Sequence, residues 1–189
     1  MYPDCALSVT LYEGLRRIDD DLASQAQKRG CPQCGGPLDR ATWTRKPRGC
    51  ESDLPAAVCV RQGLCCRCCR CRVLPDSAVF LGRKVYLGAV VLISIVVRQR
   101  SLASHSANKL RAMFGMSKST LARWLRFFLV EFPASSRWKV LRGLVSARVR
   151  DDALPDALLA EFDRRPDGPG PAALSACLAF VARGELQAS

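Results

Sequence analysis

The fold of this chain is decided by Cys31-Pro32-Gln33-Cys34-Gly35-Gly36 and, about thirty residues later, by Cys65-Cys66-Arg67-Cys68-Cys69-Arg70-Cys71. Two thiolates three positions apart bind one metal ion when the chain between them turns back sharply. A glycine after the second cysteine allows a positive φ, and backbone N–H groups can then point at the sulfur atoms. The two stretches together predict one structural Zn²⁺ site.

The partners of Cys31 and Cys34 remain open on spacing alone. In the second stretch three pairs of cysteines have the required separation: Cys65 with Cys68, Cys66 with Cys69, and Cys68 with Cys71. The chain has 11 cysteines, and this odd number argues against a fully paired disulfide framework. The single histidine, His105, lies far from the cysteines, which favours a structural ion over a catalytic one.

Four regions follow from the composition around these stretches. Residues 1–27 are an N-terminal segment with a short helix, and residues 28–82, rich in Gly, Pro, Cys and Arg, form the zinc ribbon. Residues 83–150 carry apolar runs among basic residues and form a helix-turn-helix domain. Residues 151–189 are an acidic tail interrupted by Pro and Gly, with a short helix near its end. We therefore expect a mainly α fold with a small β zinc ribbon, followed by a three-helix unit.

The helix-turn-helix motif is predicted between residues 104 and 128. A first helix over about residues 104–114 leads to Gly115, where the tight turn needs a positive φ. Ser117 is a favourable N-cap for the second helix. That helix has one apolar face, formed by Leu121, Trp124, Leu125 and Phe128. Upstream, Val85–Val97 supplies the remaining helix of the unit, although its β-branched residues leave a strand as the alternative.

The second helix also supplies the candidate DNA-contacting residues: Lys118, Ser119, Thr120, Ala122, Arg123 and Arg126. A recognition helix needs small polar and Arg side chains near its N-terminal half to enter the major groove. Arg can pair with guanine edges, whereas Lys and Ser reach phosphates. The alternative is a solvated basic face, but acids normally intersperse such a face and none occurs between Asp76 and Glu131. Further bases, such as Arg137, Arg142 and Arg150, extend the basic surface.

The charge is concentrated in the middle of the chain. Lys plus Arg total 29 against 17 Asp plus Glu, a net charge of +12. Residues 73–150 hold 14 of the bases and 2 of the acids. A basic block of this size is typical of nucleic-acid binding. Two acids are too few for the carboxylate cluster of a metal-dependent transposase, so we expect no enzyme and no small-molecule substrate.

No membrane segment is expected. The longest apolar run, Val85–Val97, is bounded by Lys84 and Arg98 and falls short of the roughly 20 residues that span a bilayer. The first twenty residues contain acids and lack the basic start and apolar run of an export signal. We therefore expect a cytoplasmic, nucleoid-associated protein whose cysteines stay reduced.

The order of motifs resembles a known family. Residues 31–38 read Cys-Pro-Gln-Cys-Gly-Gly-Pro-Leu. They are followed by Arg45-Lys46-Pro47-Arg48-Gly49, by the second cysteine stretch and by Phe80-Leu81-Gly82. The order ends with a helix-turn-helix whose last residues are Leu-Ala-Arg-Trp, at residue 124. This order is similar to small bacterial proteins with a zinc ribbon and a transposase-like helix-turn-helix, which are associated with transposable elements. The resemblance covers roughly residues 28–165.

The resemblance implies a ligand set and a role. The family has a Cys-Arg pair ahead of Phe-Leu-Gly, and counting back from Phe80 places that pair on Cys69-Arg70, so the ligands would be Cys31, Cys34, Cys66 and Cys69. It implies a DNA-binding accessory or regulatory protein of a mobile element, with a transposase or recombinase encoded nearby as partner. The alternatives are an adaptor that binds RNA or an acidic protein, or the remnant of a transposase.

Overall fold

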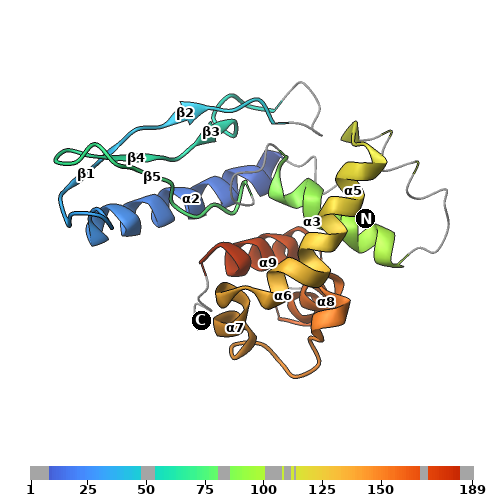
Figure 1. Ribbon diagram of the computed structural model, residues 1–189. Helices are drawn as coiled ribbons and strands as arrows, with labels where there is room; N and C mark the ends of the chain where they lie inside the picture. Colours follow the sequence, from blue (N-terminus) through green and yellow to red (C-terminus); the bar gives the residue numbers. More distant parts are fainter. Residues whose placement is uncertain are drawn as a thin grey trace.

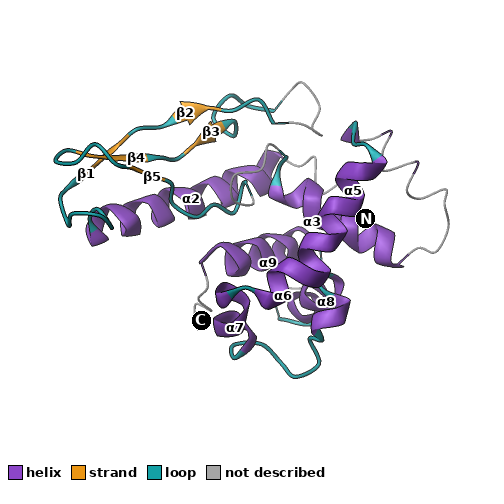
Figure 2. Cartoon of the chain, viewed as in Figure 1, coloured by secondary structure: helices purple, strands orange, loops and turns teal. Residues whose placement is uncertain are grey.

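The computed structural model describes residues 9–47, 54–80, 86–100, 108, 112, 114–166 and 170–183. Over these residues the chain is mainly helical, with two small antiparallel sheets (Figure 2). This confirms the predicted class, mainly α with a small β portion. None of the described helices is long and apolar enough to cross a membrane.

Helix α2, Val9–Arg29, is much longer than the short helix predicted for residues 1–27. Its buried side chains include Leu11, Leu15 and Leu22, which form one apolar stripe. The basic residues of its last turn interact favourably with the negative end of the helix dipole. Gly30, with a φ of 79°, then ends the helix and turns the chain toward the first cysteine.

The ribbon, which we define as residues 30–47 and 54–80, contains five short strands. These are β1 Leu38–Arg40, β2 Trp43–Thr44, β3 Val60–Arg61, β4 Leu64–Cys66 and β5 Arg72–Val73. Strand β4 lies between β1 and β5 in one antiparallel sheet, and β2 pairs with β3 in another. Figure 1 shows these strands running along α2. A small cluster of Leu38, Leu64, Cys31 and Cys66 packs with Ala26 of α2, so the ribbon has its own apolar core.

A buried carboxylate joins the far end of the ribbon to α2. Asp19 accepts hydrogen bonds from the Ser77 hydroxyl and from the Ala78 and Val79 N–H groups, the latter two at 2.6 and 3.4 Å. Its side chain is only 2% exposed, and burial raises the pKa of this carboxyl to about 6. The chain leaving the ribbon is therefore held against the middle of α2.

Helix α3, Gly88–Arg100, settles the choice between helix and strand for the apolar run. Every residue from Gly88 to Val96 is buried, because α5, α8 and α9 pack around the helix. A helix surrounded in this way is apolar on all sides, so its sequence shows no amphipathic period. Its polar end carries Arg100, which pairs with Asp156 at 2.6 Å.

The next helices form one nearly continuous rod. Helix α5, Lys118–Arg126, passes into the π-helical turn Phe127–Glu131 and then into the short helix α6, Phe132–Ala134. The Phe132 N–H bonds to the Phe127 carbonyl, five residues back. The wider turn precedes Pro133, which has no N–H to donate and whose ring would crowd a regular α-turn. Helix α7, Ser136–Arg142, follows after a Ser135 N-cap.

The C-terminal region corrects the sequence prediction of a tail over residues 151–189. The structure has a 3₁₀ turn, Asp151–Ala153, and helices α8, Asp156–Asp163, and α9, Pro171–Arg183. Leu174, Cys177 and Leu178 of α9 are fully buried, and α9 packs against α2 and α8. The short helix predicted near the end of this region is α9, whereas α8 was not predicted, because the charge and the Pro and Gly residues of this region suggested a tail.

Candidate metal centre

The first cysteine turn, residues 31–36, has two hydrogen bonds that fold it back on itself. The Cys31 N–H donates to the Gly36 carbonyl at 2.9 Å, and the Gly35 N–H donates to the Cys31 carbonyl at 2.8 Å. Gly35 has a φ of 71°, the left-handed conformation that the sequence predicts for the residue after the second cysteine. This turn places Cys31 and Cys34 on the same side of the chain.

The second cysteine turn, residues 66–71, has the same two hydrogen bonds as the first. The Cys66 N–H donates to the Cys71 carbonyl at 2.9 Å, and the Arg70 N–H donates to the Cys66 carbonyl at 3.2 Å. Arg70 has a φ of 59°, so it occupies the place of Gly35. The match pairs Cys66 with Cys31 and Cys69 with Cys34, which is the register that the resemblance implies.

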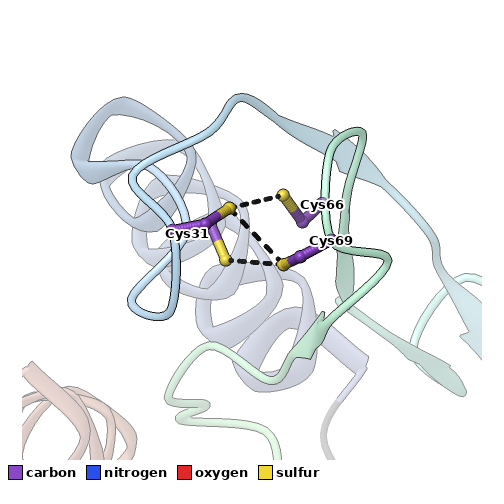
Figure 3. Close-up of side chains that lie close together, drawn as sticks. Cys31, Cys66 and Cys69 are labelled. Atoms are coloured by element: carbon purple, nitrogen blue, oxygen red, sulfur yellow. Dashed lines mark hydrogen bonds between the residues drawn. The ribbon is translucent and has the colours of Figure 1, made fainter.

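The four thiols converge on one point between the two turns. All four Sγ atoms, those of Cys31, Cys34, Cys66 and Cys69, lie within 4.8 Å of one another. The Sγ atom of Cys34 lies 3.5 Å from those of both Cys66 and Cys69, and the Sγ atoms of Cys31 and Cys69 are 3.6 Å apart. Figure 3 shows side chains from the two turns pointing toward one another. Four sulfurs about 2.3 Å from a tetrahedral ion stand about 3.8 Å apart, so this cluster has the size to hold one metal ion.

The backbone around the cluster favours thiolates. Hydrogen bonds from the backbone of Cys69 and Cys68 lower the pKa of Cys66 to about 6. A hydrogen bond from the backbone of Gln33 lowers the pKa of Cys31 in the same way. The thiolate is the form that binds metal, so these backbone contacts favour it at Cys66 and Cys31. At Cys69 a hydrogen bond from the Cys71 backbone acts in the same direction, but the neighbouring thiols of Cys34, Cys31 and Cys66 raise the pKa of Cys69 to about 12.

The remaining cysteines of the second stretch stand outside the set of four. The Cys65 thiol faces the Cys66 and Arg70 carbonyls at 3.9 and 3.8 Å. Cys68 is exposed and Cys71 is half-buried. Asp39, the acid nearest in sequence to the first turn, is held by Arg67 through two hydrogen bonds of 2.8 and 2.7 Å. His105, Cys5 and Cys50 lie outside the described residues.

The two turns differ in one testable way, because glycine is suited to a positive φ and arginine is not. A left-handed conformation costs an ordinary residue about 1–2 kcal/mol. We expect Arg70→Gly to stabilise the metal-loaded chain by about 0.5–1 kcal/mol and Gly35→Ala to destabilise it by about 1 kcal/mol. A Cβ at Gly35 meets no atom within 4 Å, so its cost is conformational alone. Chemical denaturation of the two variants checks this, and two changes of the same sign would contradict it.

The predicted helix-turn-helix residues fall into a buried and an exposed set on α5. Gly115 has a φ of 58°, and Ser117 caps the helix by accepting a hydrogen bond from the Thr120 N–H at 3.1 Å. Leu121, Trp124 and Phe128 are buried, as their spacing predicts. Five of the six candidate DNA-contacting residues are exposed: Lys118, Ser119, Ala122, Arg123 and Arg126. Most of the predicted first helix, residues 104–114, lies outside the described residues.

Thr120 is the candidate that the structure places differently. It is only 7% exposed, and its hydroxyl lies 3.0 Å from the Ser117 hydroxyl and accepts from Arg123 at 3.4 Å. The Thr120 side chain therefore contacts the N-cap of α5 and does not face solvent. Arg126 is exposed, but its Nε atom lies 3.6 Å from the Oε1 atom of Glu131, so the two side chains form an ion pair.

The downstream bases are also largely paired. Arg137 pairs with Asp76, Arg142 lies 3.5 Å from Asp151, and Arg150 pairs with Asp152. The acids of residues 151–152, which the sequence assigns to a tail, thus offset part of the basic surface. Three of the downstream bases are thus paired with acids, whereas Lys118 and Arg123 of α5 are exposed and have no ion pair among the described residues.

Sequence reasoning missed one exposed aromatic group on the ribbon. Trp43 of β2 is 38% exposed, and its ring lies over Gly63, where a Cβ would come within 2.1 Å of it. The Arg45 guanidinium lies 5.9 Å from the centre of that ring. The signal was present, since Arg45 follows Trp43 by two residues and an aromatic interleaved with bases is a pattern of nucleic-acid surfaces.

The chain was compared with known proteins, and no family model, curated protein or solved structure matches it. The site therefore rests on its own geometry. The described structure shows a four-thiol cluster with the size for one metal ion and, separately, a helix with an exposed basic face.

Proposed function

We propose that the chain is a zinc-stabilised protein that binds double-stranded DNA, with α5 as the helix that reads the major groove. One observation carries the proposal: α5 buries Leu121 and Trp124 and leaves Ala122 and Arg123 exposed between them on the opposite side. A helix that enters the groove needs this division, with its apolar face on the core and small or basic side chains outward.

The details of α5 support the proposal. Lys118 and Ser119 are exposed in the first turn, where they can reach phosphates, and Arg123 follows one turn later, where it can meet a base edge. Ala122 lies beside Arg123 and has no bulk to hold the helix away from the bases. The net charge of +12 supplies the long-range attraction that phosphate contacts need.

Zinc is the ion that the donor set favours. Four thiolates arranged around one point suit a tetrahedral ion without ligand-field preference, and structural zinc sites use this Cys₄ set. No open position or histidine is needed for such a site. Its contribution would be folding free energy of the ribbon, since the ribbon's own apolar cluster is small.

The resemblance of the motif order gives the proposal its context. A duplex-binding protein with this ribbon and helix-turn-helix would act as an accessory or regulatory protein of a mobile element, beside a transposase or recombinase encoded nearby. It would be a cytoplasmic protein associated with the nucleoid, and it would catalyse no reaction itself.

A binding experiment tests the proposal. The zinc-loaded chain is titrated with a random-sequence duplex pool across a salt series, beside single strands of the same composition, and then with duplexes enriched from the pool. We expect preference for the duplex with a steep salt dependence. Arg123→Ala should lose ~1–3 kcal/mol on the enriched duplex and little on the random pool. The matched control is Arg164→Ala, which removes an exposed arginine paired with Glu161 on α8.

A second candidate function is favoured by Trp43. An exposed aromatic ring beside an arginine suits stacking on an unpaired base, so the ribbon could bind RNA or another single strand. Preference for single strands, lost in Trp43→Ala and retained in Arg123→Ala, would replace the duplex proposal with this one.

A further inference from the structure

Cys68 lies beside the metal centre without belonging to the set of four. A Cβ added to Gly36 would stand 2.8 Å from the Cys68 sulfur and 3.3 Å from the sulfurs of both Cys34 and Cys66. Three thiols therefore surround one point at the edge of the cluster. Gly36 leaves that space open because it has no side chain.

The repeat of the two cysteine turns explains this position. Because Cys66 matches Cys31, Cys68 matches Gln33, which stands with its Oε1 atom 4.0 Å from the Cys69 sulfur. In the first turn this middle side chain is an amide, and in the second turn it is a thiol. The Cys68 sulfur shares the point above Gly36 with the sulfurs of Cys34 and Cys66, and of these two ligands only Cys34 is exposed.

Exposure separates Cys68 from the other extra cysteines. Cys68 and Cys34 are both exposed, so a small oxidant from solvent reaches both sulfurs. Cys71 is half-buried, and its thiol is directed to the Arg72 carbonyl at 3.8 Å. Cys65 is also half-buried and faces backbone carbonyls. Cys68 is accordingly the exposed thiol outside the set of four that lies next to an exposed ligand.

We propose that Cys68 is an oxidation site of the metal centre, at which peroxide joins Cys68 to the ligand Cys34 and thereby releases the metal. The proposal rests on the metal centre and is independent of what α5 binds. It adds to that centre a modification that the four-ligand set alone does not have.

The chemistry balances with hydrogen peroxide as the oxidant. The Cys68 sulfur attacks one peroxide oxygen and the O–O bond breaks. The thiol proton of Cys68 passes to the departing oxygen, which leaves as water, and Cys68 becomes a sulfenic acid. The Cys34 thiolate then leaves the ion and attacks the Cys68 sulfur; the S–O bond breaks, and the departing hydroxide takes a proton from solvent and leaves as a second water, which gives a disulfide. The two sulfurs lose two electrons to peroxide, which takes up one proton from Cys68 and one from solvent. The ion keeps three ligands and is lost to a competing chelator, and a dithiol reductant restores the site.

The test uses the full zinc-loaded chain, with Cys68→Ser and the matched control Cys71→Ser. Each protein is treated with peroxide in the presence of a chromophoric zinc chelator, and the products are mapped by mass spectrometry after alkylation. We expect the unmodified chain and Cys71→Ser to release one zinc together with a Cys34–Cys68 disulfide. Release from Cys68→Ser should be slower by about tenfold or more, because the adjacent thiol is gone.

Three results would overturn the proposal. These are release from Cys68→Ser at the rate of the unmodified chain, a disulfide that excludes Cys68, or purified chain that holds no zinc. The last result would remove the metal centre itself, and the duplex-binding measurement would still decide the role of α5. Zinc content and thermal melting before oxidation show whether each variant is folded.

Discussion

Replacing Cys66 with serine is expected to abolish binding of the single zinc ion and to unfold the ribbon. Cys66 is fully buried, and its sulfur is 3.5 Å from that of Cys34. The hydroxyl of serine is not deprotonated at neutral pH and does not replace the thiolate. Structural zinc sites contribute on the order of 10 kcal/mol to folding, so loss of one ligand leaves the small ribbon core without its main support.

The measurement is zinc content after gel filtration, together with the thiolate charge-transfer absorption of the cobalt-substituted chain. Cys65→Ser is the matched control, since it changes the neighbouring cysteine, whose thiol faces carbonyl groups. It should keep one zinc ion and the cobalt spectrum. Loss of the ion in Cys65→Ser, with retention in Cys66→Ser, would shift the ligand register by one residue.

Leu178→Ala should lower the free energy of unfolding by about 2–5 kcal/mol. Leu178 is fully buried in α9, which packs on α2 and α8, so the substitution leaves a cavity inside the main core. Chemical denaturation of the metal-loaded chain measures the change. The exposed position Ala172 of the same helix gives the control Ala172→Ser, with an expected change within about 0.5 kcal/mol.

A small effect at both positions would favour the C-terminal tail that composition predicts over the packed helix in the structure. Equal and large effects at both would mean that α9 is sensitive to any change of helix propensity. Only a large effect confined to Leu178 supports burial of this face.

Patterns of short range in the sequence predicted local structure well. The CxxC spacing with Gly35 predicts a turn whose geometry depends on only six residues, and the structure has that turn. The same holds for Gly115, Ser117 and the apolar face of α5, because a tight turn, a cap and a helical period are each local.

Features that depend on tertiary packing could not be read in this way. Spacing alone leaves the register of the second cysteine turn ambiguous. Arg70 has a positive φ in this turn, but an arginine, unlike a glycine, does not indicate that conformation in the sequence. The predicted N-terminal helix was too short, because α2 has 21 residues and packs against α9. Thr120 is buried, and its hydroxyl contacts the hydroxyl of the N-cap residue Ser117. The neighbouring residues in the sequence do not predict this contact.

Helix α2 belongs to two apolar cores at once. Leu11 and Leu15 lie in the main helical core, whereas Ala26 lies in the cluster beside the metal centre. Its 21 residues span about 30 Å. The helix therefore fixes the rotational orientation of the ribbon about the α2 axis, relative to the main core. One residue inserted between its two ends would turn the ribbon by about 100° relative to the core.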